Sequence, residues 1–144
     1  MDLAANKRAL FDYEILRRWE AGLVLTGQEV KAARAGQISL KGAYVTLHDG
    51  APMLINAHLS PFAKAGPLKN YEPRRSRRLL LNKSEVKEII GLIKQKGLTI
   101  VPLKVYTKRH RLKIEIGLGR GRKTHDKREV LKKRAIEREI RQAL

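Results

Sequence analysis

The chain contains no cysteine among its 144 residues, which excludes a disulfide framework and any thiolate metal site. Acidic residues are scarce, since 14 Asp and Glu stand against 32 Lys and Arg. No apolar run is long enough to span a membrane, and neither end carries a lipidation motif. The first residues also lack the apolar segment of a signal peptide. We therefore expect a cytoplasmic protein without a membrane partner.

The imbalance of charge points to a polyanionic partner. A formal net charge of +18 on 144 residues far exceeds what solubility requires, and a chain of this length forms one domain with a core of its own. Nucleic acid is the first candidate partner and an anionic membrane the second. The missing membrane signals favour nucleic acid.

No arrangement of residues typical of an enzyme is found. The four histidines share no metal-ligand spacing; three are interpreted as surface or strand-end residues, whereas His125 could stack on a base or bond a phosphate. Residues 117–124 approach the phosphate-loop pattern Gly-x-x-x-x-Gly-Lys-Thr, but Arg122 replaces the second glycine and prevents close backbone contact with a phosphate. No carboxylate pair suits general acid–base chemistry. We therefore expect no catalytic residue, no metal and no cofactor.

Runs of β-branched and alternating apolar residues predict several short strands. Strands are expected at residues 11–20, 22–25, 44–48, 53–58, 98–106 and 111–118. Asp49-Gly50 lies between two of them and is typical of a hairpin turn. Pro102 shifts the alternation of its strand and predicts a bulge or an edge position there.

Two helices are expected between these strands. Thr26 and Glu29 form a capping-box pattern at the start of a helix over 27–35, and Asn82 with Glu85 begins a second helix that Gly97 ends. Five or six short antiparallel strands tend to close into a small barrel, and an OB-like barrel is a common nucleic-acid reader. The predicted fold class is therefore mainly β, of the α+β kind.

Residues 59–78 break every pattern and predict a long functional loop. They hold three prolines, and six Lys and Arg against a single Glu. Like charges packed this closely repel one another unless an anion lies among them. We therefore expect Arg74, Arg75, Arg77 and Arg78 to bind phosphates.

The last 28 residues form a basic tail with ten Lys and Arg against four acids. Three glycines at its start predict a flexible, extended arm. A helix is expected over 127–144, with Asp126 as its N-cap. Its apolar stripe is too narrow for a core, so we interpret it as a helix that orders on a polyanionic surface. The alternative is a solvated basic tail without a specific role.

Glu20 stands out because it ends the first predicted strand, beside Trp19, in an otherwise basic chain. The simpler interpretation is an ordinary strand-end acid. The alternative is a hydrogen-bond acceptor for a base edge or a ribose hydroxyl.

Seven short motifs occur in an order and spacing that resemble one family. They are Asn6-Lys7-Arg8-Ala9, Glu20-Ala21-Gly22-Leu23, Gly27-Gln28-Glu29-Val30-Lys31, Arg34-Ala35-Gly36, His58-Leu59-Ser60-Pro61, Arg78-Leu79-Leu80-Leu81 and Lys123-Thr124-His125-Asp126-Lys127-Arg128. Together they resemble the small protein B (SmpB) family of bacterial proteins that bind SsrA RNA, also called tmRNA. The resemblance covers nearly the whole chain from Asn6 onward.

The resemblance implies a closed six-stranded antiparallel OB-like barrel with flanking helices over residues 1–118, and a basic tail over 119–144. It implies binding to the tRNA-like domain of tmRNA and delivery of that RNA to stalled ribosomes, in trans-translation. The tail would enter the decoding centre and become helical along the empty mRNA channel of the small subunit. Further implications are transient contact with EF-Tu on charged tmRNA, and a monomer in a one-to-one RNA complex.

The expected site residues fall into two groups. The RNA-binding group comprises Asn6, Glu20 and Leu80 by motif match, together with the basic residues Lys7, Arg8, Arg74, Arg75, Arg77 and Arg78. The ribosome-binding group of the tail comprises Lys123, His125, Asp126, Lys127, Arg128, Lys132, Lys133 and Arg134. Gly119 and Arg122 stand where alanine and lysine are common in the family, which affects only local details of the tail. Without the resemblance, the residues predict only an RNA-binding module, with a ribosomal protein or assembly factor for structured rRNA as the alternative.

Overall fold

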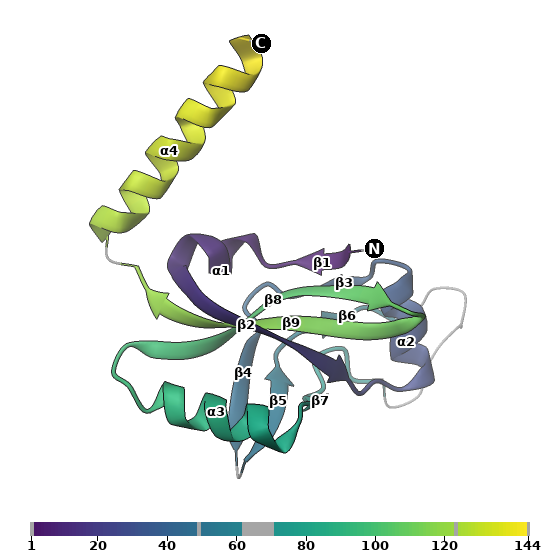
Figure 1. Cartoon of the computed structure of the whole chain (residues 1–144). Coiled ribbons are helices and arrows are strands. Elements are labelled where there is room, and N and C mark those ends of the chain that lie inside the picture. Colours follow the sequence, from purple (N-terminus) through teal and green to yellow (C-terminus); the bar gives the residue numbers. More distant parts are fainter. Residues whose placement is uncertain (1, 49, 62–70, 123, 144) are drawn as a thin grey trace.

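The computed structural model describes residues 2–48, 50–61, 71–122 and 124–143, which form a strongly curved antiparallel sheet with flanking helices (Figure 1). The helices described are α1 (Lys7–Asp12), α2 (Gly27–Arg34), α3 (Lys83–Ile93) and α4 (Thr124–Ala143). The strands described are β1 (Asp2–Ala5), β2 (Tyr13–Leu23), β3 (Ile38–Ser39), β4 (Tyr44–His48), β5 (Ala51–Ile55), β6 (His58–Leu59), β7 (Arg77–Leu80), β8 (Leu98–Lys108) and β9 (Arg111–Gly121). The prediction of a mainly β fold with flanking helices is confirmed.

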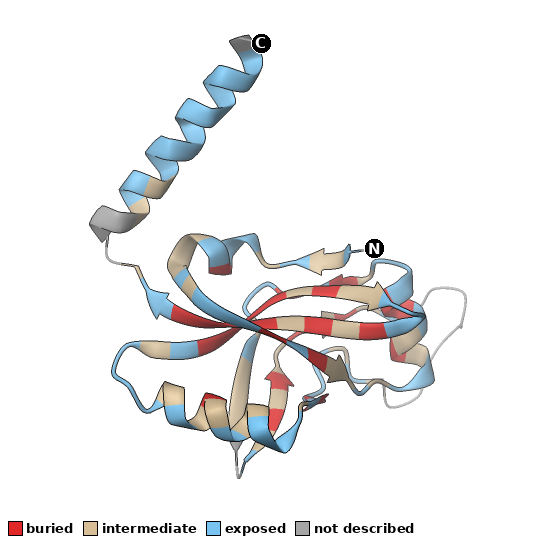
Figure 2. Ribbon diagram, viewed as in Figure 1, coloured by how far each residue is buried: buried red, intermediate tan, exposed pale blue. Residues whose placement is uncertain are grey.

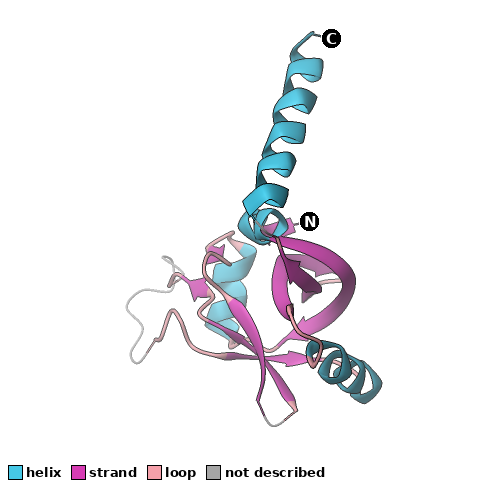
Figure 3. Ribbon diagram, turned by 90° about the vertical axis from the view of Figure 1, so that its left-hand side faces the viewer, coloured by secondary structure: helices cyan, strands magenta, loops and turns pink. Residues whose placement is uncertain are grey.

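The main sheet has seven described strands in the order β1-β8-β9-β2-β7-β5-β4, and β3 pairs with β6 beside it. The sheet curls until β4 contacts β8, which gives the rounded, OB-like outline of Figure 3. In the described strand order, β1 and β4 are the two ends and are not hydrogen-bonded neighbours. The expected closed six-stranded barrel is therefore observed as a curled seven-stranded sheet whose ends do not pair.

The core lies on the concave side of this sheet, as the alternation of β9 predicts. Leu112, Ile114, Ile116 and Leu118 are all buried, whereas the alternate residues Lys113 and Glu115 are only partly buried. Figure 2 shows the buried positions concentrated along the strands of the curled sheet. Burying alternate apolar side chains on one face is the main source of stability for such a strand.

The local signals at the starts of α2 and α3 and at the β4–β5 hairpin are confirmed, whereas α3 ends at Ile93, earlier than the expected Gly97. In the capping box of α2, the Thr26 hydroxyl accepts the Glu29 N–H at 3.2 Å, and the Glu29 carboxylate accepts the Thr26 N–H at 2.9 Å. The strands β4 and β5 pair as a hairpin; Asp49 of its predicted turn lies outside the described residues. The β8–β9 register shifts between Pro102 and Lys104, where a bulge was predicted.

The N-terminal segment differs from the prediction. The first strand was expected to begin at residue 11, but β1, α1 and then β2 are observed. Asn6 explains the change of direction, because its side chain accepts the Ala9 N–H at 3.2 Å and donates to the Pro102 carbonyl at 2.9 Å. The strand β1 exists through its pairing with β8, and a four-residue strand carries little periodic signal of its own.

The predicted flexible arm at residues 117–121 is wrong, because these residues belong to β9 and pair with β2. The glycines allow close packing: a Cβ on Gly119 would lie 3.0 Å from the Tyr13 side chain. Beyond the strand, the Arg122 N–H donates to the Asp12 carbonyl at 2.8 Å. The tail therefore leaves the sheet after Arg122 and not after residue 118.

The tail helix α4 projects away from the curled sheet (Figure 1). It begins at Thr124, so Asp126 lies inside its first turn and is not its N-cap. Its apolar side chains remain largely uncovered: Ile136 is 48% exposed and Ile140 is 55% exposed. A helix that hides so little apolar surface against its own domain is available to a partner.

Candidate RNA interface

Glu20 lies on β2 and is held by two residues of β8. The Tyr106 hydroxyl donates to its carboxylate, and the Lys108 Nζ atom lies 3.4 Å from both carboxylate oxygens. The hydrogen bond from Tyr106, assisted by Lys108, lowers the pKa of Glu20 below its ordinary value. The result is an oriented, ionised acceptor on the surface, with 36% of its side chain exposed.

The surroundings of Glu20 are strongly cationic. A surface concavity of about 470 Å³ lies beside the carboxylate. It is lined by Glu20, Lys108, Arg109, Arg111 and Lys113. A single acceptor among four cations matches an RNA surface, in which phosphates surround occasional hydrogen-bond donors.

Leu80 joins this surface from the neighbouring strand β7. Its side chain is 56% exposed and it pairs across the ladder with Gly22 of β2. Positions 20 and 22 lie on the same face of the sheet because they are two residues apart on one strand, so Leu80, opposite position 22, shares the face of Glu20. A second concavity of about 300 Å³ has Leu80, Arg111 and Lys113 in its lining, so the surfaces of Glu20 and Leu80 are continuous.

Asn6 lies elsewhere, and its side chain is occupied inside the fold. Its amide caps α1 and bonds the Pro102 carbonyl, and it is separated from β2 by β8 and β9. Lys7 and Arg8 are exposed on α1, where Arg8 pairs with Asp12 at 3.1 Å. The structure therefore does not bring Asn6, Lys7 and Arg8 together with Glu20.

The prediction that Arg77 binds phosphate is wrong. Its side chain is 0% exposed and its Nη2 atom lies 2.6 Å from a carboxylate oxygen of Glu29. Its Nε atom donates to the same carboxylate at 2.8 Å, and its Nη1 and Nη2 atoms donate to the Ala57 carbonyl at 2.6 Å and the Pro73 carbonyl at 3.0 Å. Because every edge of the guanidinium is engaged in the interior, Arg77 ties β7 to α2 and to the backbone just before β6, and it does not face a ligand.

Glu29 therefore has a second function besides capping α2. Burial alone would raise the pKa of Glu29, but hydrogen bonds from Arg75, the Thr26 N–H and Arg77 outweigh it and hold that pKa at about 2. Arg75 contributes through its Nη2 atom, 2.5 Å from Glu29, and remains 43% exposed. Arg75 therefore stabilises the fold through its ion pair with Glu29, while part of its side chain still faces solvent.

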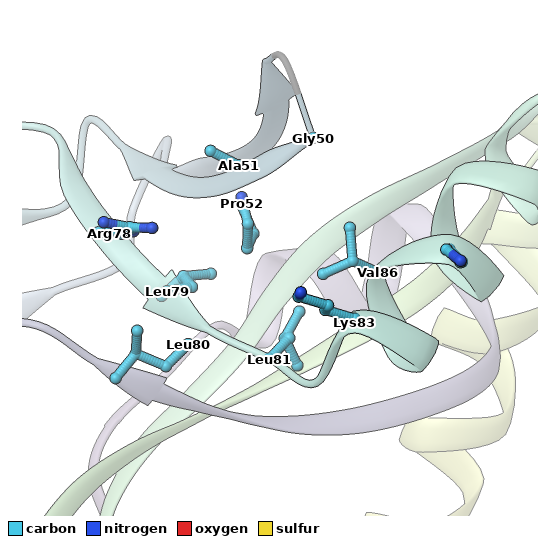
Figure 4. Close-up of a pocket in the computed structure, with 10 residues that line it drawn as sticks. Gly50, Ala51, Pro52, Arg78, Leu79, Leu80, Leu81, Lys83 and Val86 are labelled. Carbon is cyan, nitrogen blue, oxygen red and sulfur yellow. The ribbon is translucent and has the colours of Figure 1, made fainter.

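Arg74 and Arg78 are the exposed members of the cluster. The Arg74 Nη1 atom donates to the Asn56 side chain at 2.9 Å. Arg78 makes no side-chain hydrogen bond or ion pair within the described part of the chain. It borders a concavity of about 520 Å³ that lies between the β4–β5 hairpin, β7 and α3 (Figure 4). Lys83 and Lys87 of α3 line the same concavity, which extends the cationic surface beyond Leu80.

The tail residues are only partly described. Lys123 lies outside the described residues, and His125 and Asp126 are placed by their helical backbone alone. Lys127 is near the sheet domain, with its Nζ atom 3.3 Å from Asp12. The remaining predicted tail cations are exposed along α4: Arg128, Lys132, Lys133 and Arg134.

Among the described residues, no helix is long and apolar enough to cross a membrane. No group of three or more His, Cys, Asp or Glu side chains in that part of the chain is placed to hold a metal ion.

A curled OB-like sheet with joined cationic concavities and a projecting basic helix defines a small RNA-binding protein. The family model of the SmpB protein matches residues 3–144, and the chain belongs to this family. The SsrA-binding protein of Trichormus variabilis is 51% identical over 139 residues, covering 96% of this chain and 90% of that protein. The SsrA-binding protein of Thermosynechococcus vestitus is 46% identical over 142 residues, covering 99% of this chain and 93% of the relative.

A solved structure gives the same result for the fold. It is described as “tmRNA-SmpB: a journey to the center of the bacterial ribosome”, and one of its chains matches with a TM-score of 0.69 and 44% identity. The match covers 88% of this chain and 92% of that chain. The resemblance drawn from the seven motifs is confirmed.

Proposed function

We propose that the chain binds the tRNA-like domain of tmRNA and delivers this RNA to stalled ribosomes for trans-translation. The observation that carries the proposal is the continuous surface on which Glu20 and Leu80 meet among Arg109, Arg111 and Lys113. The family motifs implied both residues, and only the pairing of β2 with β7 brings them together.

On this surface, cations and acceptor have different tasks. The exposed Lys and Arg side chains neutralise phosphates and supply most of the affinity, without reading the sequence. Glu20 would repel phosphate unless it accepts a hydrogen bond from a base edge or a 2′-hydroxyl. Tyr106 and Lys108 hold the carboxylate in one orientation, so the acceptor is positioned before the RNA arrives. Leu80 offers an apolar contact beside it.

The tail acts away from this surface. The helix α4 projects from the domain with exposed cations, which suits the proposed passage through the decoding centre and along the empty mRNA channel. In this proposal one monomer binds one tmRNA in the cytoplasm, and EF-Tu joins transiently on the charged RNA.

The test is the substitution Glu20→Gln, measured against a transcript of the tRNA-like domain. Removing the charge from an acceptor that bonds RNA should weaken binding by roughly tenfold or more, and the melting temperature should change little because the side chain is exposed. Glu14→Gln is the matched control, since Glu14 is an exposed acid on the same strand. It should leave binding unchanged or tighten it slightly. Tighter binding by Glu20→Gln would show that Glu20 merely repels phosphate.

A further inference from the structure

The turn between β8 and β9 has an unfavourable backbone conformation for its residues. Only Arg109 and His110 separate the paired residues Lys108 and Arg111, and their φ angles are +51° and +66°. Two consecutive left-handed residues are characteristic of a type I′ turn, for which Asn-Gly is strongly preferred. Arginine and histidine lack the properties that make this conformation easy, so their presence has an energetic cost.

The turn is held in place from a second element. The Arg34 Nη2 atom, from α2, donates to the His110 carbonyl at 2.7 Å. This contact uses the backbone of the turn and leaves both turn side chains exposed. Within the described part of the chain, no hydrogen bond or ion pair is formed by the side chains of Arg109 and His110. The fold therefore fixes the backbone of the turn and presents the two side chains to solvent.

The turn also occupies the boundary between the two concavities of the proposed RNA surface. Arg109 lines the concavity that contains Glu20, and His110 lines the one that contains Leu80. The following residues, Arg111 and Lys113, line both. Each turn side chain thus lies beside one of the two residues expected to read the RNA.

We propose that the Arg109–His110 turn is a further RNA-contacting element, in which Arg109 binds a phosphate next to Glu20 and His110 contacts the nucleotide next to Leu80. An arginine binds phosphate through paired N–H groups, and an imidazole stacks on a base or bonds a phosphate oxygen. This inference rests on the proposed function. It accounts for the cost of the turn, since strained residues persist where their side chains are needed.

The decisive variant replaces both residues by the sequence that the turn prefers, Arg109→Asn with His110→Gly. If the two side chains served only the fold, this change would stabilise the protein and leave its affinity for RNA unchanged. We expect two opposite effects instead: the melting temperature rises by a few degrees, because the left-handed residues become favourable, and the affinity for the tRNA-like domain transcript falls roughly tenfold. The slope of log affinity against log salt should decrease by about one phosphate equivalent. Lys96→Asn is the control, since it removes one exposed charge near the opposite end of β8.

The outcomes separate this inference from the proposed function. Unchanged RNA affinity in the Asn-Gly variant, with normal binding by the unmodified protein, overturns the inference alone. An equal loss from Lys96→Asn also overturns it, because the effect would then be one of total charge. If the double variant melts lower, Arg109→Gln decides, since it removes the cation without introducing glycine; binding within twofold of normal counts against the inference. Absence of binding by the unmodified protein removes both the proposed function and the inference.

Discussion

Replacing Arg77 by methionine should destabilise the protein far more than the same replacement at the adjacent Arg78. Arg77 is 0% exposed and its guanidinium is paired with Glu29, which is 2% exposed. Methionine has a similar length but provides no donors. The substitution would therefore leave Glu29 with Arg75 as its remaining cationic partner and would strand the Ala57 and Pro73 carbonyls.

The magnitude follows from these contacts. Removing one partner of a buried ion pair costs about 3–5 kcal/mol, and here the cost arises because Glu29 loses part of its compensation and the two carbonyls lose their donor. For a domain of this size that loss lowers the melting temperature by roughly 10–15 °C. Arg78 is exposed and has no side-chain partner among the described residues, so Arg78→Met should change stability by no more than about 0.5 kcal/mol.

The assay pairs urea unfolding with RNA titration at two salt concentrations. Arg77→Met should lose stability and, at temperatures where it is folded, retain its salt slope for RNA binding. Arg78→Met should keep its stability, bind the tRNA-like domain more weakly and lose about one phosphate equivalent of slope. Equal stability of the two variants would refute the assignment of Arg77 to the interior.

Three further predictions concern Glu29, the glycines of β9 and the tail. The pKa of Glu29 is about 2 in the folded chain against an ordinary 4.5, so its contribution to stability is complete above about pH 5 and falls by roughly 3 kcal/mol as the pH drops towards 2. The free energy of unfolding in urea should therefore fall more steeply, as the pH is lowered, for the unmodified protein than for Glu29→Gln, and equal slopes would contradict this prediction. Gly119→Ala should cost about 1–3 kcal/mol, because its Cβ would crowd Tyr13, whereas Gly121→Ala, with open space around its Cβ, should be nearly neutral by thermal melting. A chain ending after Arg122 should melt and bind RNA like the full chain but fail in peptide tagging on stalled ribosomes; full tagging activity would exclude a role for α4.

Much of the β structure could be predicted because its signals are local. Alternation along β9 identifies the buried face, and Thr26 with Glu29 marks the start of α2 without reference to any distant contact. The strand β1 could not be found in this way, since its four residues depend on pairing with β8, about a hundred positions away. Residues 117–121 were wrongly predicted to form a flexible arm, because glycine is typical of flexible segments. Their place in a strand depends on the distant Tyr13 ring, which leaves no room for a Cβ at Gly119.

The candidate site was predicted only in part for the same physical reason. A cluster of arginines does not reveal which member is buried, and Glu29 lies 48 positions from Arg77. One signal was present: Leu80 was expected on the RNA surface, and the two-residue period of a strand then places Arg78 on the same face and Arg77 on the opposite, buried face. The strands expected at 98–106 and 111–118 predict a turn between them, and the structure has one there. The left-handed conformation of Arg109 and His110 could not be predicted, because both residues are atypical of it.

The central claim is that tmRNA is the RNA partner of this chain, and sequencing the RNA that co-purifies with the full-length protein tests it most directly. The RNA should be recovered from wild-type protein and from Glu20→Gln under the same wash conditions. We expect tmRNA to be strongly enriched on the wild-type protein and depleted on the variant, with ribosomal RNA present in less than equimolar amounts. Ribosomal RNA in stoichiometric amounts without enrichment of tmRNA would contradict the claim and indicate a ribosomal protein or assembly factor.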